Sequence, residues 1–182
     1  MPRVAAGAGK NALLLTGPPG VGKTTVVRKV ASRFQGTRVR GFVTDEIRVD
    51  GERLGFRLET FDGQSAVLAR VGLASAHRVG RYGVDLAALD RVVEAVLGLE
   101  PPADVYLVDE IGRMECLSPR FVAATAALLA SGLPLLATVA ARGGGLIESA
   151  KRHPGVEVWT VTRENRDGLP GSVLEWIRSA CR

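Results

Sequence analysis

The sequence predicts an α/β fold of three layers, in which a mostly parallel β-sheet is covered by helices on both faces and carries an antiparallel β-hairpin insert. Short apolar runs alternate along the chain with segments whose apolar residues recur at helical spacing. This alternation is typical of a parallel sheet between two helical layers. Residues 38–70 differ, because they hold three segments of period-two polarity separated by Asp-Gly pairs. Such pairs favour hairpin turns, so a β-meander insert is expected there.

The first half of the chain has well-marked element boundaries. An apolar run at residues 12–16 is expected to be a buried strand, and the periodic residues 23–34 are expected to form a helix after it. The strands of the meander are expected at residues 39–47, 53–61 and 65–69. Residues 77–82 are expected to be a loop, followed by a helix that Asp85 opens and Gly98 closes.

The second half continues the alternation of strands and helices. Strands are expected at residues 104–108, 134–139 and 156–161, and helices at residues 119–130, 145–151 and 170–180. Residues 121–141 carry no charge and are long enough for a membrane-spanning helix. However, Ser118 and Pro119 mark a helix start just before this run, and Pro134 interrupts it. We therefore expect a helix and a buried strand there, and no membrane segment.

The bulk composition indicates one domain, residues 1–182, with residues 1–10 as a flexible N-terminal extension. The 24 Lys and Arg residues against 19 Asp and Glu residues give a net charge of +5, without a long basic run. A positive net charge weakly favours an anionic partner, and the phosphates of a nucleotide would be such a partner. Nucleic acid is compatible with the charge but is not indicated, because the nine aromatic residues form no stacking series.

Cys116 and Cys181 are the two cysteines of the chain, and neither has the spacing of a metal site. Free thiols in a reducing compartment are their expected state, which predicts a cytoplasmic protein. The first ten residues also lack the apolar segment of a signal peptide.

Residues Gly17 to Thr24 read GPPGVGKT and match the phosphate-loop pattern G-x-x-x-x-G-K-[ST]. The loop lies between an expected strand and an expected helix, which is the context that phosphate binding needs. Backbone N–H groups and the helix N-terminus hold phosphates there, Lys23 reaches the outer phosphates, and Thr24 is placed to offer its hydroxyl to Mg²⁺. The sequence therefore predicts a P-loop NTPase fold. The expected nucleotide-binding residues are Gly17, Pro18, Pro19, Gly20, Val21, Gly22, Lys23 and Thr24.

Residues 105–110 form the expected partner of a phosphate loop, an apolar strand that ends in two carboxylates. Asp109 is predicted to serve the Mg²⁺ ion that bridges the outer phosphates, and Glu110 to orient and deprotonate the attacking water. Residues 44–46, at the end of another strand, could line the same cleft. The alternative is that both carboxylates only end a strand at the surface, but the phosphate loop favours the catalytic interpretation.

Four further residues lie near strand ends and have two interpretations each. Arg113 could neutralise charge in a transition state, or it could pair with Glu115 on the surface. Thr138 could hold the attacking water beside the γ-phosphate, or it could reflect only the β-propensity of threonine. Arg163 and Asn165 could contact the base or the ribose, or they could belong to a solvated loop.

Five segments occur in the order seen in the THEP1-type nucleoside-triphosphatase family, and the chain resembles that family over about residues 12–166. The segments are GPPGVGKTT, GFVTDEIR, RVGRYGVDL, VDEIGRMEC and VTRENR. The resemblance implies a RecA-like strand order, a monomer, and Mg²⁺-dependent hydrolysis of ATP, GTP, CTP and UTP. It also implies that phosphate binding extends to Thr25, that Thr24 and Asp109 bind the metal, and that Glu110 is catalytic.

Hydrolysis of nucleoside triphosphates is therefore the predicted function, with Glu110, Lys23, Arg113 and Thr138 as the expected catalytic residues. The main alternative is a kinase that transfers the γ-phosphate to a small-molecule or nucleic-acid hydroxyl, with hydrolysis as a side reaction. A third hypothesis is a nucleotide-dependent switch on RNA or DNA. Stimulation of turnover by a hydroxyl acceptor, or by a polynucleotide at low salt, would distinguish these alternatives from simple hydrolysis.

Overall fold

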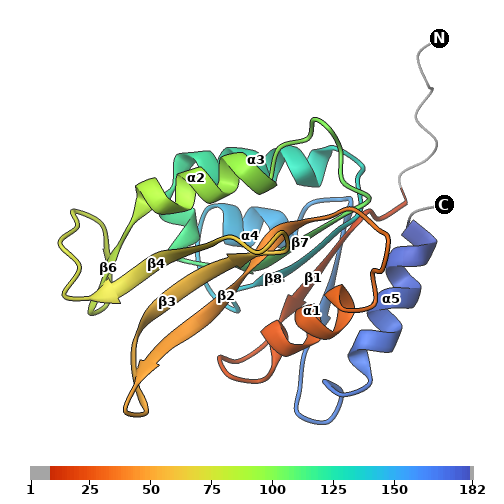
Figure 1. Ribbon diagram of the computed structural model, residues 1–182. Helices are drawn as coiled ribbons and strands as arrows, with labels where there is room; N and C mark the ends of the chain where they lie inside the picture. The colour runs from red at the N-terminus through yellow and green to blue at the C-terminus, as the bar shows by residue number, and fades with distance from the viewer. Residues whose placement is uncertain (1–8, 181–182) are drawn as a thin grey trace.

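The computed structural model describes residues 9–180, so most of the expected N-terminal extension, and Cys181, lie outside the described residues. The described strands share one sheet (Figure 1). They are β1 (Ala12–Thr16), β2 (Val39–Val49), β3 (Glu52–Thr60), β4 (Ser65–Val71), β5 (Arg78–Val79), β6 (Tyr82–Val84), β7 (Val105–Ile111), β8 (Leu135–Val139) and β9 (Val156–Thr160).

The strand order across the sheet is β5-β6-β4-β3-β2-β7-β8-β1-β9. Among the described strands, β3 and β6 run opposite to the others, so most of the sheet points in one direction. Strand β8 lies between β1 and β7, as a RecA-like order requires. The predicted α/β class, with a mostly parallel sheet and an antiparallel insert, is confirmed.

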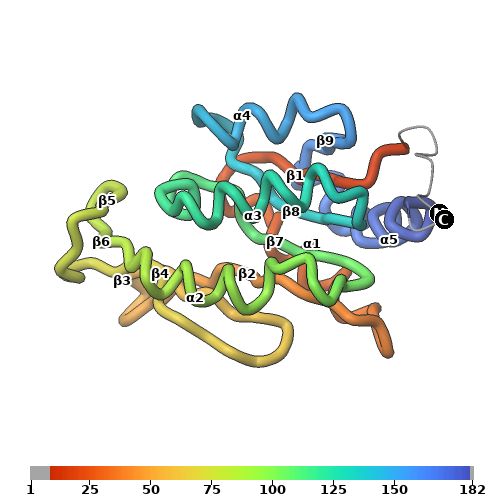
Figure 2. Tube along the Cα trace, turned by 90° about the horizontal axis from the view of Figure 1, so that it is seen from above, coloured from red at the N-terminus to blue at the C-terminus, as the bar shows by residue number. Residues whose placement is uncertain are grey.

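The helices form a layer on each face of the sheet. They are α1 (Lys23–Ala31), α2 (Leu86–Val96), α3 (Pro119–Ala130), α4 (Leu146–Lys151) and α5 (Leu169–Ala180). Helices α1 and α5 cover one face, and α2, α3 and α4 cover the other (Figures 1 and 2). Leu13 and Leu15 belong to the core beneath α1 and α5, whereas Ala12 and Leu14 belong to the core beneath α2, α3 and α4. Successive strand residues face opposite layers, so a strand covered on both sides has to be apolar throughout.

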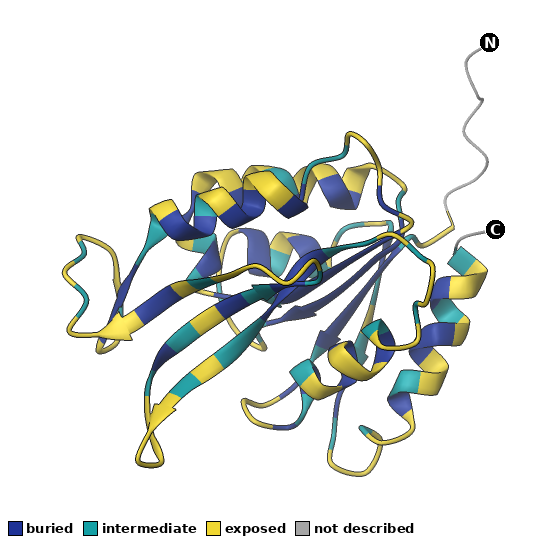
Figure 3. Cartoon of the chain, in the orientation of Figure 1, coloured by how far each residue is buried: buried dark blue, intermediate teal, exposed yellow. Residues whose placement is uncertain are grey.

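The antiparallel part of the sheet is larger than expected. The expectation of a loop at residues 77–82 is wrong, because this segment contains β5 and contributes to β6, which pair with each other and extend the sheet beyond β4. These strands have two and three residues, which is too short for a period-two pattern to be visible in the sequence. Figure 2 shows this hairpin at the end of the molecule opposite to α5. Figure 3 shows the central strands buried and the tip of the β2–β3 hairpin exposed.

Strand β7 continues farther than the apolar run that predicts it. It ends at Ile111, so Asp109 and Glu110 lie inside the strand and not after its end. The register between β7 and β8 shifts between Val108 and Ile111, which places both carboxylates at an irregular part of the ladder. Helix α1, by contrast, ends at Ala31, before the expected limit.

The uncharged run at residues 121–141 forms most of α3, a turn and β8. Ser118 caps α3, because its hydroxyl oxygen accepts a 3.0 Å hydrogen bond from the Phe121 N–H group. Within residues 9–180, none of the helices combines the length and apolarity needed to cross a bilayer.

The absence of a side chain at Gly41 allows the backbone of β2 to approach the backbone of β7 closely. A Cβ atom at Gly41 would lie 1.9 Å from the Leu107 carbonyl oxygen, and the φ angle there is +123°. We expect Gly41→Ala to lower the free energy of unfolding by about 3 kcal/mol, because backbone atoms would have to move apart to admit the methyl group.

Gly36→Ala is the matched control in the same urea-unfolding measurement. Gly36 also has a positive φ of +72°, but nothing lies within 4 Å of its Cβ position. Gly36→Ala is expected to lower the free energy of unfolding by only about 1 kcal/mol, because a residue with a Cβ atom is disfavoured at a positive φ. Equal losses in the two variants would contradict the steric explanation for Gly41.

Candidate active site

The phosphate loop joins the carboxyl end of β1 to α1. Gly22 has a φ angle of +113°, which glycine adopts without steric cost. A Cβ atom on Gly17 would lie 2.7 Å from the Val161 carbonyl oxygen, so the loop packs against the chain that follows β9. Val21 is buried in the core beneath α1 and α5, which anchors the loop from inside. The exposed residues of the segment are Pro18, Pro19, Gly20 and Thr25.

Lys23 is the first residue of α1 and is buried. Its Nζ atom donates hydrogen bonds to the Gly17 carbonyl oxygen at 3.1 Å and to the Pro18 carbonyl oxygen at 3.4 Å. The same atom lies 3.8 Å from Glu110 Oε2. A buried ammonium needs such acceptors, and they hold its charge at the centre of the loop.

Asp109 is the most heavily hydrogen-bonded carboxylate of the site and is buried. It accepts a 2.6 Å hydrogen bond from the Thr24 hydroxyl on α1 and a 2.5 Å hydrogen bond from the Thr138 hydroxyl on β8. The Thr44 hydroxyl on β2 donates to the Asp109 carbonyl oxygen at 2.5 Å. Burial raises the pKa of Asp109, against the opposing effects of the Thr138 and Thr24 hydroxyls, the Thr44 backbone and the charge of Lys23.

From the sequence, the Thr138 hydroxyl is expected beside the γ-phosphate, where it could hold the attacking water, but it lies in the interior of the protein. The Thr138 side chain is fully buried, and its hydroxyl donates to Asp109 Oδ1. The structure therefore places the Thr138 hydroxyl against the Asp109 carboxylate.

Glu110 follows Asp109 and is the more accessible of the two carboxylates, with 34% of its side chain exposed. Burial raises its pKa, the positive charge of Lys23 lowers it, and the charge of Asp109 raises it again. A partly exposed carboxylate of raised pKa beside a phosphate loop has the properties of a general base.

Glu115 is a third acidic residue of the site, and it is buried with only 5% of its surface exposed. Burial raises the pKa of Glu115 to about 8, and the nearby charges of Glu110 and Asp109 add to the rise. Gly112 lies between two of these carboxyl groups. A Cβ atom there would lie 2.8 Å from Glu115 Oε2 and 3.0 Å from Glu110 Oε1.

Arg113 is exposed, three residues beyond Glu110. The alternative that it pairs with Glu115 on the surface is wrong, because Glu115 is buried. A role for Arg113 in neutralising transition-state charge stays a prediction.

Residues 44–46 divide between the site and the surface. Thr44 contacts Asp109 as described. Asp45 instead pairs with Arg28 of α1, and Glu46 pairs with arginines of the β2–β3 hairpin. Only the first of these three residues therefore contributes to the site.

The loop after β9 contains both residues that the sequence indicated for nucleoside contact. The Asn165 amide is used within its own loop, since Nδ2 donates to the Thr160 carbonyl oxygen and Oδ1 accepts from the Thr162 N–H group, each at 2.8 Å. Arg163 is exposed. Within the described residues, the Asn165 side chain therefore makes its hydrogen bonds to the backbone of its own loop.

Arg166 connects this loop to the phosphate loop, and sequence patterns do not single it out. Its Nη1 atom donates a 3.2 Å hydrogen bond to the Val21 carbonyl oxygen. Its Cδ atom would lie 3.3 Å from a Cβ atom on Gly22. No local signal separates Arg166 from Arg163, because the contact depends on β9 lying beside β1.

Oxygen donors suited to Mg²⁺ lie together at Thr24 and Asp109, which are joined by a 2.6 Å hydrogen bond. Across residues 9–180 no group of three His, Cys, Asp or Glu side chains is arranged to bind a metal. Mg²⁺ does not need such a cage, because it keeps several waters and takes one or two carboxylates together with substrate phosphates. The hydroxyl and carboxylate present here fit that ion.

The sheet order, the phosphate loop and the Thr24–Asp109 contact define a P-loop nucleotide-binding protein. The chain belongs to the NTPase family, because the family model described as NTPase matches residues 12–174. It is 41% identical to the nucleoside-triphosphatase THEP1 of Thermofilum pendens over 178 residues, which cover 94% of this chain and 97% of that protein.

Two solved structures are similar over nearly the whole chain. The solution structure of a human cancer-related nucleoside triphosphatase superposes with a TM-score of 0.78 at 35% identity, covering 93% of this chain and 98% of that one. The crystal structure of THEP1 from Aquifex aeolicus gives a TM-score of 0.76 at 31% identity, covering 91% and 98%. The resemblance to the THEP1-type family is therefore confirmed.

The raised pKa of Glu115 predicts how stability depends on pH. Its pKa is about 8 in the folded protein against an ordinary value of 4.5, so the folded state holds this proton more tightly than the unfolded chain does. The resulting stability is complete below about pH 4.5 and is lost as the pH rises to about 8. We expect Glu115→Gln to make the free energy of unfolding fall less steeply between these pH values.

Urea unfolding at several pH values, without Mg²⁺ or nucleotide, measures this slope. Asp109 and Glu110 also have raised pKa values, so part of the decline remains in the variant. Glu175→Gln, at an exposed position of α5, controls for the loss of one carboxylate. Parallel curves for the wild type and Glu115→Gln would rule out a protonated Glu115.

Proposed function

We propose that this chain hydrolyses nucleoside 5′-triphosphates to the diphosphate and phosphate, with Mg²⁺ as its cofactor. Its membership of the NTPase family and the names of its relatives support this reaction. The observation that carries the proposal is the hydrogen-bonded series Thr24, Asp109 and Thr138. This series fixes a buried carboxylate beside the phosphate loop, with Glu110 as its neighbour in the chain.

Nucleotide binding is assigned to the phosphate loop. The N–H groups of residues 17–25 and the N-terminus of α1 would hold the phosphates. The Lys23 ammonium contacts the Gly17 and Pro18 carbonyl oxygens, which are neutral acceptors. Anionic phosphate oxygens are stronger acceptors, so a bound triphosphate would compete well for this donor.

Thr24 and Asp109 would hold Mg²⁺, which when bound neutralises charge on the outer phosphates. Thr138 and Thr44 act through Asp109. Thr138 fixes the carboxylate oxygen that does not contact Thr24, and Thr44 fixes the backbone carbonyl oxygen. Both threonines are positioning residues in this proposal.

Glu110 is the proposed general base. Its partly exposed carboxylate is accessible to water, and burial raises its pKa, which strengthens it as a base. Lys23, 3.8 Å away, favours the ionised form that can accept a proton. The proton of the attacking water passes to the Glu110 carboxylate as the water oxygen bonds to the γ-phosphorus. The bond from the γ-phosphorus to the oxygen that bridges it to the β-phosphate breaks, and the diphosphate leaves with the electron pair on that oxygen. Arg113 would then stabilise the charge of the transition state from its exposed position.

The proposed substrates are ATP, GTP, CTP and UTP, with the exposed Arg163 as a candidate contact to the base. We also expect a monomer that acts as one domain in a reducing, cytoplasmic setting. The single sheet formed by the described strands supports one domain.

A nucleic-acid switch has less support than hydrolysis. Arginines of the β-meander would be the natural surface for a polynucleotide, but residues 38–70 carry six acidic residues for their six arginines. Arg48 and Arg53 pair with Glu46, and Arg57 pairs with Glu59. The meander therefore does not present a continuous positive surface.

Replacement of Glu110 tests the catalytic assignment. Glu110→Gln keeps the shape of the side chain but removes the base, so we expect kcat to fall about 1,000-fold while nucleotide affinity is retained. Phosphate release from the four nucleoside triphosphates with Mg²⁺ measures the first quantity, and calorimetric titration measures the second. Glu175→Gln, on the exposed face of α5, is the control and is expected to behave as wild type.

Three outcomes would contradict the proposal. Unchanged turnover in Glu110→Gln would remove the base assignment. Phosphate transfer to a hydroxyl acceptor at a rate far above hydrolysis would support the kinase alternative, and acceleration by RNA that weakens with salt would support the switch.

Replacement of Thr138 tests the positioning of the metal ligand. Thr138→Val removes the hydrogen bond to Asp109 Oδ1 at nearly constant volume, so we expect the Mg²⁺ concentration for half-maximal hydrolysis to rise about tenfold. Thr138→Ser keeps the hydroxyl and is the matched variant, expected to stay near wild type. Identical Mg²⁺ titration curves for the Val and Ser variants would contradict the positioning role.

A further inference from the structure

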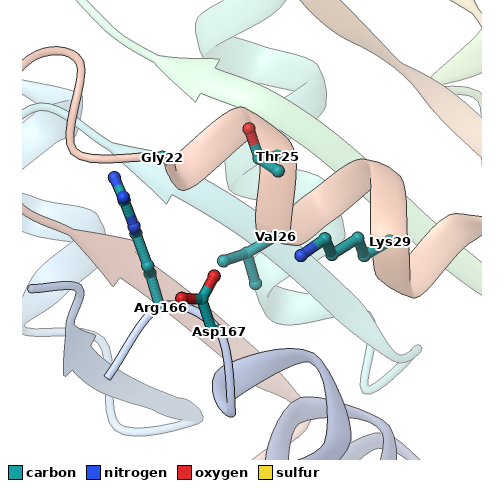
Figure 4. A pocket seen from close by; sticks show the side chains of 6 residues that line it. All are labelled: Gly22, Thr25, Val26, Lys29, Arg166 and Asp167. Atoms are coloured by element: carbon teal, nitrogen blue, oxygen red, sulfur yellow. The ribbon is translucent and has the colours of Figure 1, made fainter. Parts of the chain in front are cut away.

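A cavity of about 300 Å³ lies between the first turns of α1 and the loop that follows β9 (Figure 4). Its lining residues are Gly22, Thr25, Val26, Lys29, Arg166 and Asp167. Gly22 and Thr25 belong to the phosphate-binding segment, so the cavity begins where that segment ends. Its volume lies at the lower end of the range seen for small-molecule sites.

The order of the strands fixes which end of a nucleotide would face this cavity. Asp109 and Glu110 lie on β7, which is separated from β1 by β8. The cavity is on the other side of β1, because β9 pairs directly with β1 and leads into the loop that carries Arg166 and Asp167. A triphosphate with its γ-phosphate toward Glu110 therefore has its α-phosphate and sugar toward this cavity.

Arg166 shapes the cavity from the side of the phosphate loop. Its Nη1 atom is held by the Val21 carbonyl oxygen at 3.2 Å, and its stem lies against Gly22. These contacts fix the guanidinium beside the segment that binds phosphates. Arg166 therefore makes a wall of the cavity and joins it to the loop.

The side chain of Asp167 is a hydrogen-bond acceptor in the lining of the cavity. Within residues 9–180, no side-chain hydrogen bond or ion pair is formed by its carboxylate, and the residue is exposed. Figure 4 shows the carboxylate directed toward the space beside Val26, with Lys29 on the same side of α1. An ionised carboxylate only accepts hydrogen bonds, so its ligand has to present donors.

The donors nearest to the α-phosphate of a nucleotide are the 2′- and 3′-hydroxyls of ribose. Two neighbouring hydroxyls match the two oxygens of one carboxylate, and acidic residues bind ribose hydroxyls in this way in dinucleotide-binding folds. The base is attached at C1′, on the side of the sugar ring away from the C5′ atom that carries the phosphates, so most of the base lies farther from Gly22 and Thr25.

We propose that this cavity is a ribose subsite in which the Asp167 carboxylate accepts hydrogen bonds from the sugar hydroxyls. The chain then prefers ribonucleoside triphosphates to their 2′-deoxy forms, whatever the base. This inference rests on the proposed function, because it concerns the same bound nucleotide.

Kinetics with matched sugars tests the subsite. We expect the wild type to have a kcat/KM about tenfold higher for ATP than for 2′-deoxyATP, and for GTP than for 2′-deoxyGTP, with the difference mainly in KM. Asp167→Ala is expected to raise KM for the ribonucleotides about tenfold and to remove the preference. Glu164→Ala is the control, because Glu164 is exposed on the same loop but does not line the cavity.

Calorimetric binding of ADP and 2′-deoxyADP separates this inference from the proposed function. If the wild type binds ADP more tightly than 2′-deoxyADP and Asp167→Ala loses this difference, the subsite is supported. If the wild type also hydrolyses no triphosphate, only the proposed function fails. Hydrolysis without any preference for ribose, or a preference that survives in Asp167→Ala, would overturn the subsite alone. An altered ratio of ATP to GTP, equal for both sugars, would also overturn it, because the carboxylate would then contact the base.

Discussion

The site depends on the burial of one carboxylate, Asp109, beside the phosphate loop. A buried carboxylate is costly unless hydrogen-bond donors compensate for the water that it loses. Here two hydroxyls donate to the carboxylate, from Thr24 on α1 and Thr138 on β8, and the Thr44 hydroxyl on β2 donates to the backbone carbonyl oxygen of the same residue. The same bonds that offset the cost of burial therefore fix the loop, the central strands and the first helix relative to one another.

Charge is concentrated around this carboxylate. Asp109, Glu110 and Glu115 lie within a short segment, and burial raises the pKa of each. Repulsion from neighbouring carboxylates adds to the rise for Glu110 and Glu115. Lys23 is the buried cation that faces them. The carboxylates of Asp109 and Glu110 beside one buried cation leave surplus negative charge that a divalent cation would reduce. We infer that this acidity, which is costly to bury, suits the site to the proposed Mg²⁺ ion.

Much of the fold and the heart of the site could be predicted, because their signals are local. The phosphate loop is complete within residues 17–24, because its glycines, its lysine and its threonine all lie within these eight residues. The strands β1 and β8 are apolar apart from one threonine each because helices cover both faces, and this is visible in the sequence as short apolar runs. Asp109 and Glu110 follow another such run, although the strand itself extends past them. The hairpin β5–β6 could not be predicted from the sequence, because strands of two and three residues are too short to show an alternation of polar and apolar residues.

The sequence by itself determined which chemical groups the chain carries and which of them are neighbours along the backbone. Only the tertiary structure decided which groups meet across the sheet. Thr138 contacts Asp109 because β8 lies between β1 and β7, and Arg166 reaches the phosphate loop because β9 lies on the other side of β1. The burial of Glu115 has the same origin, in the packing of its turn against β7 and α3. Strand order arises from the packing of the whole chain, and no short segment contains it.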